Sequence, residues 1–410
     1  MASDASHGRP PLDLALREAL DERERAGLRR QLRPVQARDG TVVTLGGRKV
    51  VNVASNDYLG LSTHPALAEA AARAARDWGA GSGASRLICG SHAPHQDLEE
   101  SIASWQQTPA ALAFASGFAA ASGTIPALVG PGDLVLLDRL SHACCIDAAK
   151  ASGATWRPFH HNDPDHLQRL LQQADSSHPA ARATRRRRVL VVTEAVFSMD
   201  GDAAALEDII EVKDRHGAWL LLDEAHATGL HGPRGAGLAE ARGLGPRVEV
   251  HLGTLGKAVG ASGGFIAGSR TLVDWLVNAA RSFVFSTAPA PAAAAAATEG
   301  IRIIQSNEGE ALRQQAWRNI RDLASRFPIP CPDPQGAILP WILGDEDRAM
   351  QAAQLLLDAG FLAPAIRYPT VPRRAARIRL TMSAAHSPGQ VHQLADALAC
   401  VASGPFTPTP

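Results

Sequence analysis

Cysteine, tyrosine and methionine are all scarce in this chain of 410 residues, which has 5, 2 and 4 of them. The cysteine count is odd and no two cysteines have the CxxC spacing. The sequence therefore indicates neither a disulfide framework nor a zinc site. A protein without disulfides fits a reducing compartment, so we expect it to be cytoplasmic.

The chain also lacks an excess of charge and any long apolar run. Its 41 Lys and Arg balance 41 Asp and Glu, which argues against a nucleic-acid partner and against a membrane-surface partner. No apolar run has the length of a membrane span, and the first residues lack the basic and apolar regions of a secretory signal. The four arginines at 185–188 have no interleaved aromatic residues, so they predict a solvated loop rather than a nucleic-acid site.

Short apolar runs alternate with helix-length segments through the middle of the chain. We expect seven strands, at 110–114, 134–138, 155–159, 188–193, 219–222, 248–252 and 264–267. This alternation is typical of an α/β fold with a mostly parallel sheet covered by helices on both faces. Before these strands we expect a helix over 12–33 and a hairpin over 38–53, and after residue 289 a smaller α+β region.

The stretch Val248–Ala261 places a single lysine, Lys257, in a turn between glycines just after an expected strand. The nearest acid in sequence is Glu249, back in that strand. An amine in a small-residue, partly apolar pocket loses its proton more easily, and a neutral lysine amine can attack a carbonyl. A lone lysine in a glycine-rich turn is also a common solvated surface residue, so the neighbouring strands must decide between these readings.

Two of the expected strands end in clusters of polar residues. One is followed by Asp223, Glu224 and His226, and the other by Glu194, Ser198 and Asp200. Ligands of open α/β sheets bind at the carboxyl ends of the strands, so these side chains and Lys257 predict one site. An Asp and a His without a further nearby ligand argue against a metal there.

Seven motifs occur in order along the chain: SNDYLGL, SGF, LSHA, VVTEAVFSMDGD, LLLDEAHATG, GTLGKAVG and RIRLTMSAAH. Together they resemble the α-oxoamine synthases, pyridoxal-phosphate enzymes of the aminotransferase kind, and the resemblance covers nearly the whole chain. It implies the fold of PLP-dependent transferases of type I, with a large domain around a seven-stranded sheet and a smaller α+β C-terminal domain. The implied divisions are an N-terminal arm over 1–55, the large domain over 56–288 and the small domain over 289–410.

The resemblance implies pyridoxal 5'-phosphate as the cofactor. Lys257 would hold it as a Schiff base and move the substrate α-proton, Asp223 would keep the pyridine nitrogen protonated, and His226 would bond to the ring hydroxyl. Ser198 would also contact the cofactor. The phosphate would be held by the backbone of Gly117 and Phe118, the Thr254 hydroxyl and, from a neighbouring subunit, Ser286 and Thr287. The active site would then be shared within a homodimer.

The resemblance also implies contacts to an amino-acid substrate. His142 would stack over the cofactor ring and contact the substrate, and Asn56 would lie near the substrate carboxylate. Arg379 lies in an apolar run, where a buried arginine needs a partner such as that carboxylate. Where the family commonly has Ser, this chain has Cys144, whose thiol is a weaker hydrogen-bonding group.

At the acyl end, Arg29 in the N-terminal helix would meet a carboxylate on the acyl chain, with Arg30 and Arg33 as alternatives. Thr370 would be a further substrate contact. The implied reaction joins L-alanine to a pimeloyl thioester, carried on CoA or on acyl carrier protein, in biotin biosynthesis.

Two other readings are open. One is a different α-oxoamine synthase, namely 2-amino-3-ketobutyrate CoA ligase, 5-aminolevulinate synthase or serine palmitoyltransferase. The other is a non-catalytic binding protein on the same fold. The complete set of Lys257, Asp223 and His226 argues against this second reading.

Overall fold

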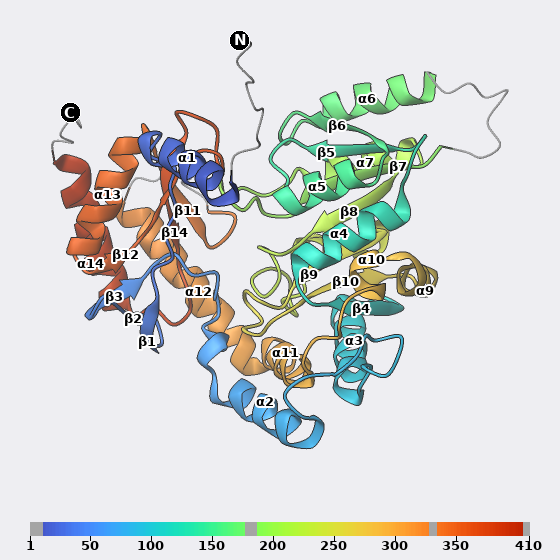
Figure 1. Cartoon of the computed structure of the whole chain (residues 1–410), viewed down its shortest axis with the longest axis horizontal. Helices are drawn as coiled ribbons and strands as arrows, with labels where there is room; N and C mark the ends of the chain where they lie inside the picture. The colour runs from blue at the N-terminus through green and yellow to red at the C-terminus, as the bar shows by residue number, and fades with distance from the viewer. Residues whose placement is uncertain (1–10, 177–186, 328–333, 405–410) are drawn as a thin grey trace, which may run out of the picture.

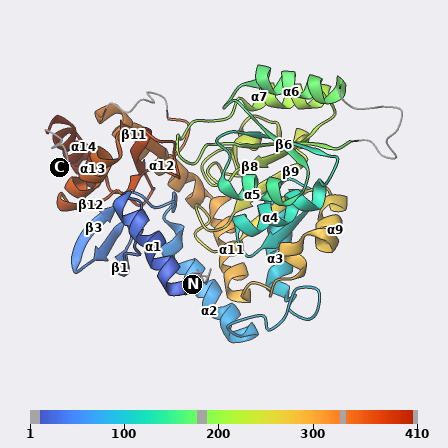
Figure 2. The same ribbon diagram turned by 45° about the horizontal axis from the view of Figure 1, so that its top comes forward.

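The computed structural model describes residues 11–176, 187–327 and 334–404. In Figures 1 and 2 the blue beginning and the red end of the chain lie together on one side of the molecule. The green and yellow middle of the chain forms the other side. The arginines at 185–188 lie partly outside the described residues.

The middle of the chain is built on one seven-stranded sheet, as expected. Its strands are β4 (Ala110–Phe114), β5 (Leu134–Asp138), β6 (Thr155–Phe159), β7 (Val189–Glu194), β8 (Trp219–Asp223), β9 (Val250–Thr254) and β10 (Gly264–Gly268). They lie in the order β4-β10-β9-β8-β7-β5-β6. Strands β9 to β6 are parallel, whereas β10 is antiparallel to both of its neighbours.

Helices cover both faces of this sheet, and for that reason its central strands are buried along nearly their whole length. One face packs on α4 (Gly117–Leu128), α5 (Ala143–Ala151), α9 (Arg270–Ala279) and α10 (Arg281–Val284). The other face packs on α6 (Pro164–Ser176), α7 (Leu206–Arg215) and α8 (Leu238–Ala241). Helices α2 (Pro65–Trp78), α3 (Ala93–Gln106) and α11 (Pro291–Ile304) pack together beside β4.

The two ends of the chain share a sheet on the other side of the molecule. Strands β1 (Val35–Asp39), β2 (Val42–Leu45) and β3 (Arg48–Asn52) form an antiparallel meander, and β3 pairs with β12 (Phe361–Leu362). A second sheet has the order β11 (Ile338–Gly344), β14 (Ala376–Thr381), β13 (Ala365–Ile366). Helices α12 (Asn307–Arg326), α13 (Glu346–Asp358) and α14 (Pro388–Ser403) pack with these strands. The side of the molecule opposite the large sheet is therefore built from both termini.

Helix α1 (Leu12–Arg25) is shorter than the sequence predicted. Gly27 adopts a φ of 63°, and the N–H of Leu28 donates to the Arg23 carbonyl at 2.7 Å, which ends the helix in the way that C-terminal glycines usually do. Arg29 therefore lies beyond the helix, and its expected place within the helix was wrong. The expected hairpin is part of a three-stranded meander, which is larger than the sequence predicted. Among the described helices, none combines the length and the apolar character that a bilayer crossing needs.

Candidate active site

Lys257 lies in the loop that joins the antiparallel strands β9 and β10, at the carboxyl end of the large sheet. Two close approaches shape its surroundings. A side chain at Gly260 would come within 2.5 Å of the Leu61 backbone, and one at Gly264 within 2.4 Å of the Gly117 nitrogen. Glycine at these positions lets the backbone at Leu61 pack directly against the lysine loop and lets the start of α4 pack against the first residue of β10.

A chain of hydrogen bonds runs from Lys257 to Arg379. The Lys257 amine lies 2.7 Å from His226 Nε2, and His226 Nδ1 lies 2.5 Å from the Tyr58 hydroxyl. The same hydroxyl lies 3.3 Å from Asn56 Oδ1, which accepts a bond of 3.1 Å from Arg379. Four of the five residues in this chain were predicted as site residues from the sequence. The fifth, Tyr58, was not predicted, and it links the other four.

Burial changes the proton affinities along this chain. Loss of solvent lowers the pKa of Lys257 to about 8 and lowers the pKa of His226 well below its ordinary value. Burial raises the pKa of Tyr58 to about 12, so its hydroxyl keeps its proton. The hydroxyl donates its one proton to Asn56 Oδ1, so it accepts from His226 Nδ1–H, and His226 Nε2 accepts a hydrogen bond from the Lys257 amine.

Two carboxylates lie side by side at the ends of the neighbouring strands β7 and β8. Glu194 and Asp223 are paired in register, and both are buried. Burial raises the pKa of Asp223 and raises that of Glu194 to about 8, in each case because a charged carboxylate is poorly solvated there. Glu224, by contrast, accepts a hydrogen bond of 2.8 Å from the Ala239 N–H and so faces α8.

The start of α4 provides backbone N–H groups beside the lysine loop. Helix α4 begins at Gly117, and its first N–H groups have no acceptor within the helix. A side chain at Gly117 would lie 3.6 Å from Thr254 Cβ, so Thr254 is next to this helix end. Phe118 is 53% exposed. The predicted residues Gly117, Phe118 and Thr254 are therefore brought together.

His142 caps the start of α5. Its Nδ1 accepts a hydrogen bond of 3.2 Å from the Cys144 N–H and lies 2.9 Å from the Cys144 sulfur. This contact with the thiol raises the pKa of His142. Cys144, which stands where the family commonly has Ser, is thus in direct contact with His142, the predicted ring-stacking residue.

Arg379 in β14 is buried and has only neutral hydrogen-bond partners. Its Nε donates to the Ser198 carbonyl at 2.6 Å and its Nη1 to the Thr381 hydroxyl at 3.1 Å, in addition to the bond to Asn56. No ion pair of Arg379 occurs among the described residues. The Ser198 N–H in turn donates to Glu194 at 3.0 Å.

Four other predicted residues make contacts away from the lysine. Ser286 donates to the Thr287 carbonyl, and Thr287 pairs with Ser85. Arg29 pairs with Glu24 at 3.2 Å, both of them exposed. Arg30 donates to the Thr370 hydroxyl at 3.1 Å, so the alternative arginine is the one that touches the predicted substrate threonine.

Tyr58 and Cys145 were missed as site residues by the sequence reasoning, and Glu194 was left without a role. Tyr58 could have been found, because it is one of only two tyrosines and lies in the motif that contains Asn56. Cys145 gave no signal, because its nearness to Asp223 depends on how α5 packs on the sheet.

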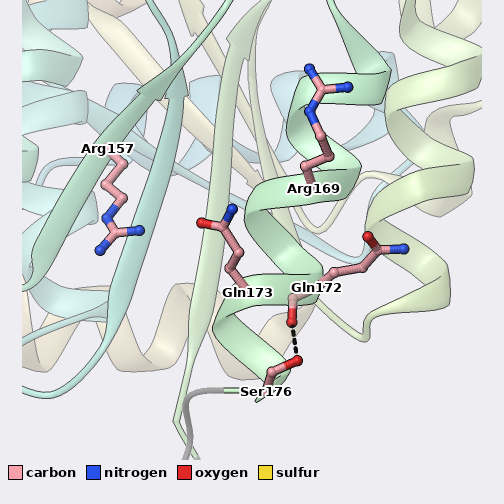
Figure 3. A pocket seen from close by; sticks show the side chains of 5 residues that line it. All are labelled: Arg157, Arg169, Gln172, Gln173 and Ser176. Carbon is pink, nitrogen blue, oxygen red and sulfur yellow. Dashed lines mark hydrogen bonds between the residues drawn. The ribbon is translucent and has the colours of Figure 1, made fainter.

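A separate hollow of about 570 Å³ lies between β6 and α6 (Figure 3). Its lining residues are Arg157, Arg169, Gln172, Gln173 and Ser176. Ser176 already donates to the Gln172 carbonyl at 2.8 Å. None of the lining side chains is a carboxylate, thiol or imidazole, so this hollow offers no acid, base or strong nucleophile.

Comparison with known proteins shows which family the chain belongs to. Residues 48–398 match the family described as aminotransferase class I and II. An 8-amino-7-oxononanoate synthase of Anaeromyxobacter dehalogenans strain 2CP-1 is 46% identical over 385 residues, which cover 94% of each chain. One of Anaeromyxobacter sp. strain Fw109-5 is 49% identical over 391 residues, which cover 95% of this chain and 96% of that one.

The solved structures extend the likeness to the whole fold. A serine palmitoyltransferase from S. paucimobilis, solved with PLP bound together with myriocin, has a TM-score of 0.87 at 28% identity. The match covers 96% of this chain and 98% of that one. The chain therefore belongs to the aminotransferase class I and II family, with the fold of its PLP-dependent members. Within that family, its identity to the curated relatives assigns it to the 8-amino-7-oxononanoate synthases.

Proposed function

We propose that the protein condenses L-alanine with a pimeloyl thioester. The reaction releases CO₂ and the thiol and gives 8-amino-7-oxononanoate for biotin biosynthesis. The observation that carries this proposal is the hydrogen-bond chain that joins the amine of the half-buried Lys257 to the buried guanidinium of Arg379. It offers a reactive amine and a carboxylate-binding group to one amino-acid substrate.

The described residues fit pyridoxal phosphate as the cofactor. Asp223 and Glu194 are buried carboxylates, and Glu194 Oε1 accepts no hydrogen bond from the described residues, so a cationic ring nitrogen would be stabilised beside them. The start of α4 with Thr254 would hold a phosphate. When bound, pyridoxal phosphate supplies an aldehyde that bonds to amines and a ring that withdraws electrons from the substrate α-carbon.

The protein's own groups would bind, orient and move protons. Lys257 would attach the cofactor and take the proton from the alanine α-carbon, for which a pKa of about 8 is suited because both forms are accessible near neutral pH. Asp223 would hold a proton at the pyridine nitrogen. His226 would orient the Lys257 amine in the cofactor-free protein and would hydrogen-bond to the ring hydroxyl of bound cofactor. His142 would stack over the ring and contact the substrate.

The substrate carboxylates would be held by arginines. Arg379, with its neutral partners, has donors for the alanine carboxylate, and Asn56 would assist it. At the acyl end, an arginine of the N-terminal segment would bind the free carboxylate of the pimeloyl chain beside Thr370. The contact between Arg30 and Thr370 makes Arg30 a candidate equal to Arg29.

Sequence identity supports this reaction over that of a sister enzyme. The curated relatives named as 8-amino-7-oxononanoate synthases are 46% and 49% identical to the chain, whereas the serine palmitoyltransferase from S. paucimobilis is 28% identical. The carboxylate-binding arginines fit an acyl chain that ends in a charge better than the wholly apolar chain of a palmitoyl group.

We further propose a cytoplasmic homodimer with shared sites. Ser286 contacts Thr287, and Thr287 pairs with Ser85, and both would complete the phosphate site of a second copy. The cysteines Cys89, Cys144, Cys145 and Cys400 are unpaired, which supports a reducing compartment.

A substrate matrix tests the function. Purified protein with pyridoxal phosphate is given L-alanine, glycine or L-serine against acetyl-, succinyl-, palmitoyl- and pimeloyl-CoA and pimeloyl-acyl carrier protein, and thiol release and product mass are measured. We expect the highest turnover with L-alanine and a pimeloyl thioester. Faster turnover with another acyl group would assign the protein to a sister activity. No turnover with any pair would contradict an enzymatic role.

A further inference from the structure

Two thiols and a carboxylate meet at the base of the lysine site. Cys144 and Cys145 lie in the first turn of α5, and Asp223 ends β8. One ligand atom from each of these residues lies within 4.8 Å of the other two, and all three side chains are buried. The spacing of the cysteines along the chain gave no hint of this cluster, because the cysteines lie in a helix and the third member lies in strand β8.

The spacing of the two sulfur atoms suits a tetrahedral metal ion. The Sγ atoms of Cys144 and Cys145 are 3.9 Å apart. Bonds of about 2.3 Å from zinc to sulfur put two thiolates on one tetrahedral ion roughly 3.8 Å apart. A carboxylate oxygen of Asp223 supplies a third ligand. The fourth position would be left to water or to His142, whose Nδ1 lies 2.9 Å from the Cys144 sulfur.

The electrostatics of the site also favour a cation. Asp223 and Glu194 are buried next to each other, and Glu194 Oε1 accepts no hydrogen bond from the described residues. Lys257 and Arg379 are strongly basic side chains at this site, and both already make hydrogen bonds, the Lys257 amine to His226 and the Arg379 guanidinium to neutral groups. A divalent ion with two thiolate ligands would offset this buried negative charge, because thiolates bind such ions strongly.

We propose that Cys144, Cys145 and Asp223 bind a thiophilic divalent cation of the Zn²⁺ and Cd²⁺ class, and that this cation and pyridoxal phosphate exclude each other. Binding forms two metal–sulfur bonds and one metal–oxygen bond, and it releases the two thiol protons to solvent without any change of oxidation state. The exclusion rests on the proposed function, because it takes Asp223 as the partner of the pyridine nitrogen. The binding itself does not rest on it.

Cadmium titration of the full-length protein, freed of cofactor, tests the site. Cd²⁺ is the probe because cadmium–thiolate bonds absorb in the ultraviolet. We expect one Cd²⁺ per chain with this absorption. Cys144→Ser and Cys145→Ser should each weaken binding by at least about tenfold, since loss of even an outer partner of a metal site costs that much. The exposed cysteines provide matched controls, Cys89→Ser and Cys400→Ser, which should bind as the parent does.

The result that overturns the site is unchanged Cd²⁺ affinity and absorption in Cys144→Ser. Serine has nearly the size of cysteine, so this variant should fold, and its circular dichroism is compared with that of the parent. A second titration in saturating pyridoxal phosphate should show at least about tenfold weaker Cd²⁺ binding, as linkage requires for mutual exclusion. Equal affinity with and without cofactor would refute the exclusion. Failure of the proposed function would appear separately, as absence of product in the substrate matrix with Cd²⁺ binding intact.

Discussion

The amine of Lys257 and Nε2 of His226 lie 2.7 Å apart, and burial lowers the pKa of both groups. Because the Tyr58 hydroxyl donates to Asn56, the other ring nitrogen of His226 donates to that hydroxyl, and Nε2 accepts a hydrogen bond from the Lys257 amine. A lysine held in this way is ready to react as a neutral amine. Tyr58 from the SNDYLGL motif and His226 from the LLLDEAHATG motif are thus linked by hydrogen bonds to Lys257.

The first prediction concerns the protonation of Lys257. In cofactor-free protein, labelling of Lys257 by an acylating reagent should rise with pH through a midpoint near 8, because the neutral amine reacts and its pKa is lowered to about 8. Mass spectrometry of the digest measures it, with exposed Lys49 as internal reference. A midpoint at or above pH 10 would contradict the lowered pKa.

Asp223→Asn should keep cofactor binding but reduce turnover by at least about a hundredfold, because a neutral amide does not hold a proton at the pyridine nitrogen. It should also move the Lys257 labelling midpoint to lower pH. The negative charge of Asp223 raises the pKa of Lys257, so its removal acts in the opposite direction. The matched control is Glu224→Gln, an adjacent buried carboxyl that faces α8 and should change neither quantity. A wild-type rate in Asp223→Asn would refute the role.

Tyr58→Phe removes the hydroxyl that contacts His226 and leaves the ring in place. Loss of one buried hydrogen bond, typically worth about 1 kcal/mol, should lower kcat by roughly fivefold to tenfold while the fold is kept. The chain offers one control, Tyr368→Phe, whose ring lies against Arg373. The readout is the Lys257 labelling midpoint, which should shift in Tyr58→Phe and stay unchanged in Tyr368→Phe. An unchanged midpoint in both variants would show that Tyr58 does not act on the lysine.

Much of the fold could be predicted because its strands are apolar runs without alternation. The seven strands of the large sheet lie close to their expected positions. Six of them are buried along nearly their whole length, and such strands leave a plain signal in sequence, whereas the edge strand β6 is mostly exposed. Strand β10 was not predicted to be antiparallel. The loop that carries Lys257 is only nine residues long, from 255 to 263, so it returns the chain without a crossover helix.

The sequence predicted most of the residues of the candidate site, but it predicted only some of the contacts between them. Asp223, Lys257 and His226 could be grouped because parallel strands end at one edge of a sheet. The contact of Tyr58 with His226 joins residues 168 positions apart, and no local pattern encodes it. The end of α1 was misjudged because Gly27 is a single residue in an otherwise helical stretch, and its positive φ depends on the turn that follows.

A shared active site predicts complementation between two inactive variants. Lys257→Ala lacks the reactive amine, and Thr287→Ala lacks the proposed phosphate contact across the subunit interface. Hybrids formed by mixing the two proteins should contain one intact site, so up to about a quarter of wild-type activity should return if half of the dimers are hybrids. Subunit exchange is followed with differently tagged chains. Full activity in a monomer at assay concentration would exclude the shared site.

The last prediction separates the two neighbouring arginines at the acyl end. A buried carboxylate without a partner is costly, whereas an arginine can meet it with two hydrogen bonds worth about 1.5–3 kcal/mol. Loss of the correct arginine should therefore raise KM for the pimeloyl thioester by roughly tenfold to a hundredfold and leave KM for L-alanine unchanged. Arg30 donates to Thr370, whereas Arg29 is engaged with Glu24, so we expect the larger effect in Arg30→Ala.

The two single variants are compared with pimeloyl thioester and with an uncharged acyl thioester of the same length. In the affected variant, KM for the uncharged thioester should change less than KM for the pimeloyl thioester, because the uncharged chain has no carboxylate for the arginine to bind. If Arg29→Ala alone shows this pattern, the residue first indicated by sequence is the acyl contact, and if neither does, the N-terminal arginines are solvated and the carboxylate is bound elsewhere.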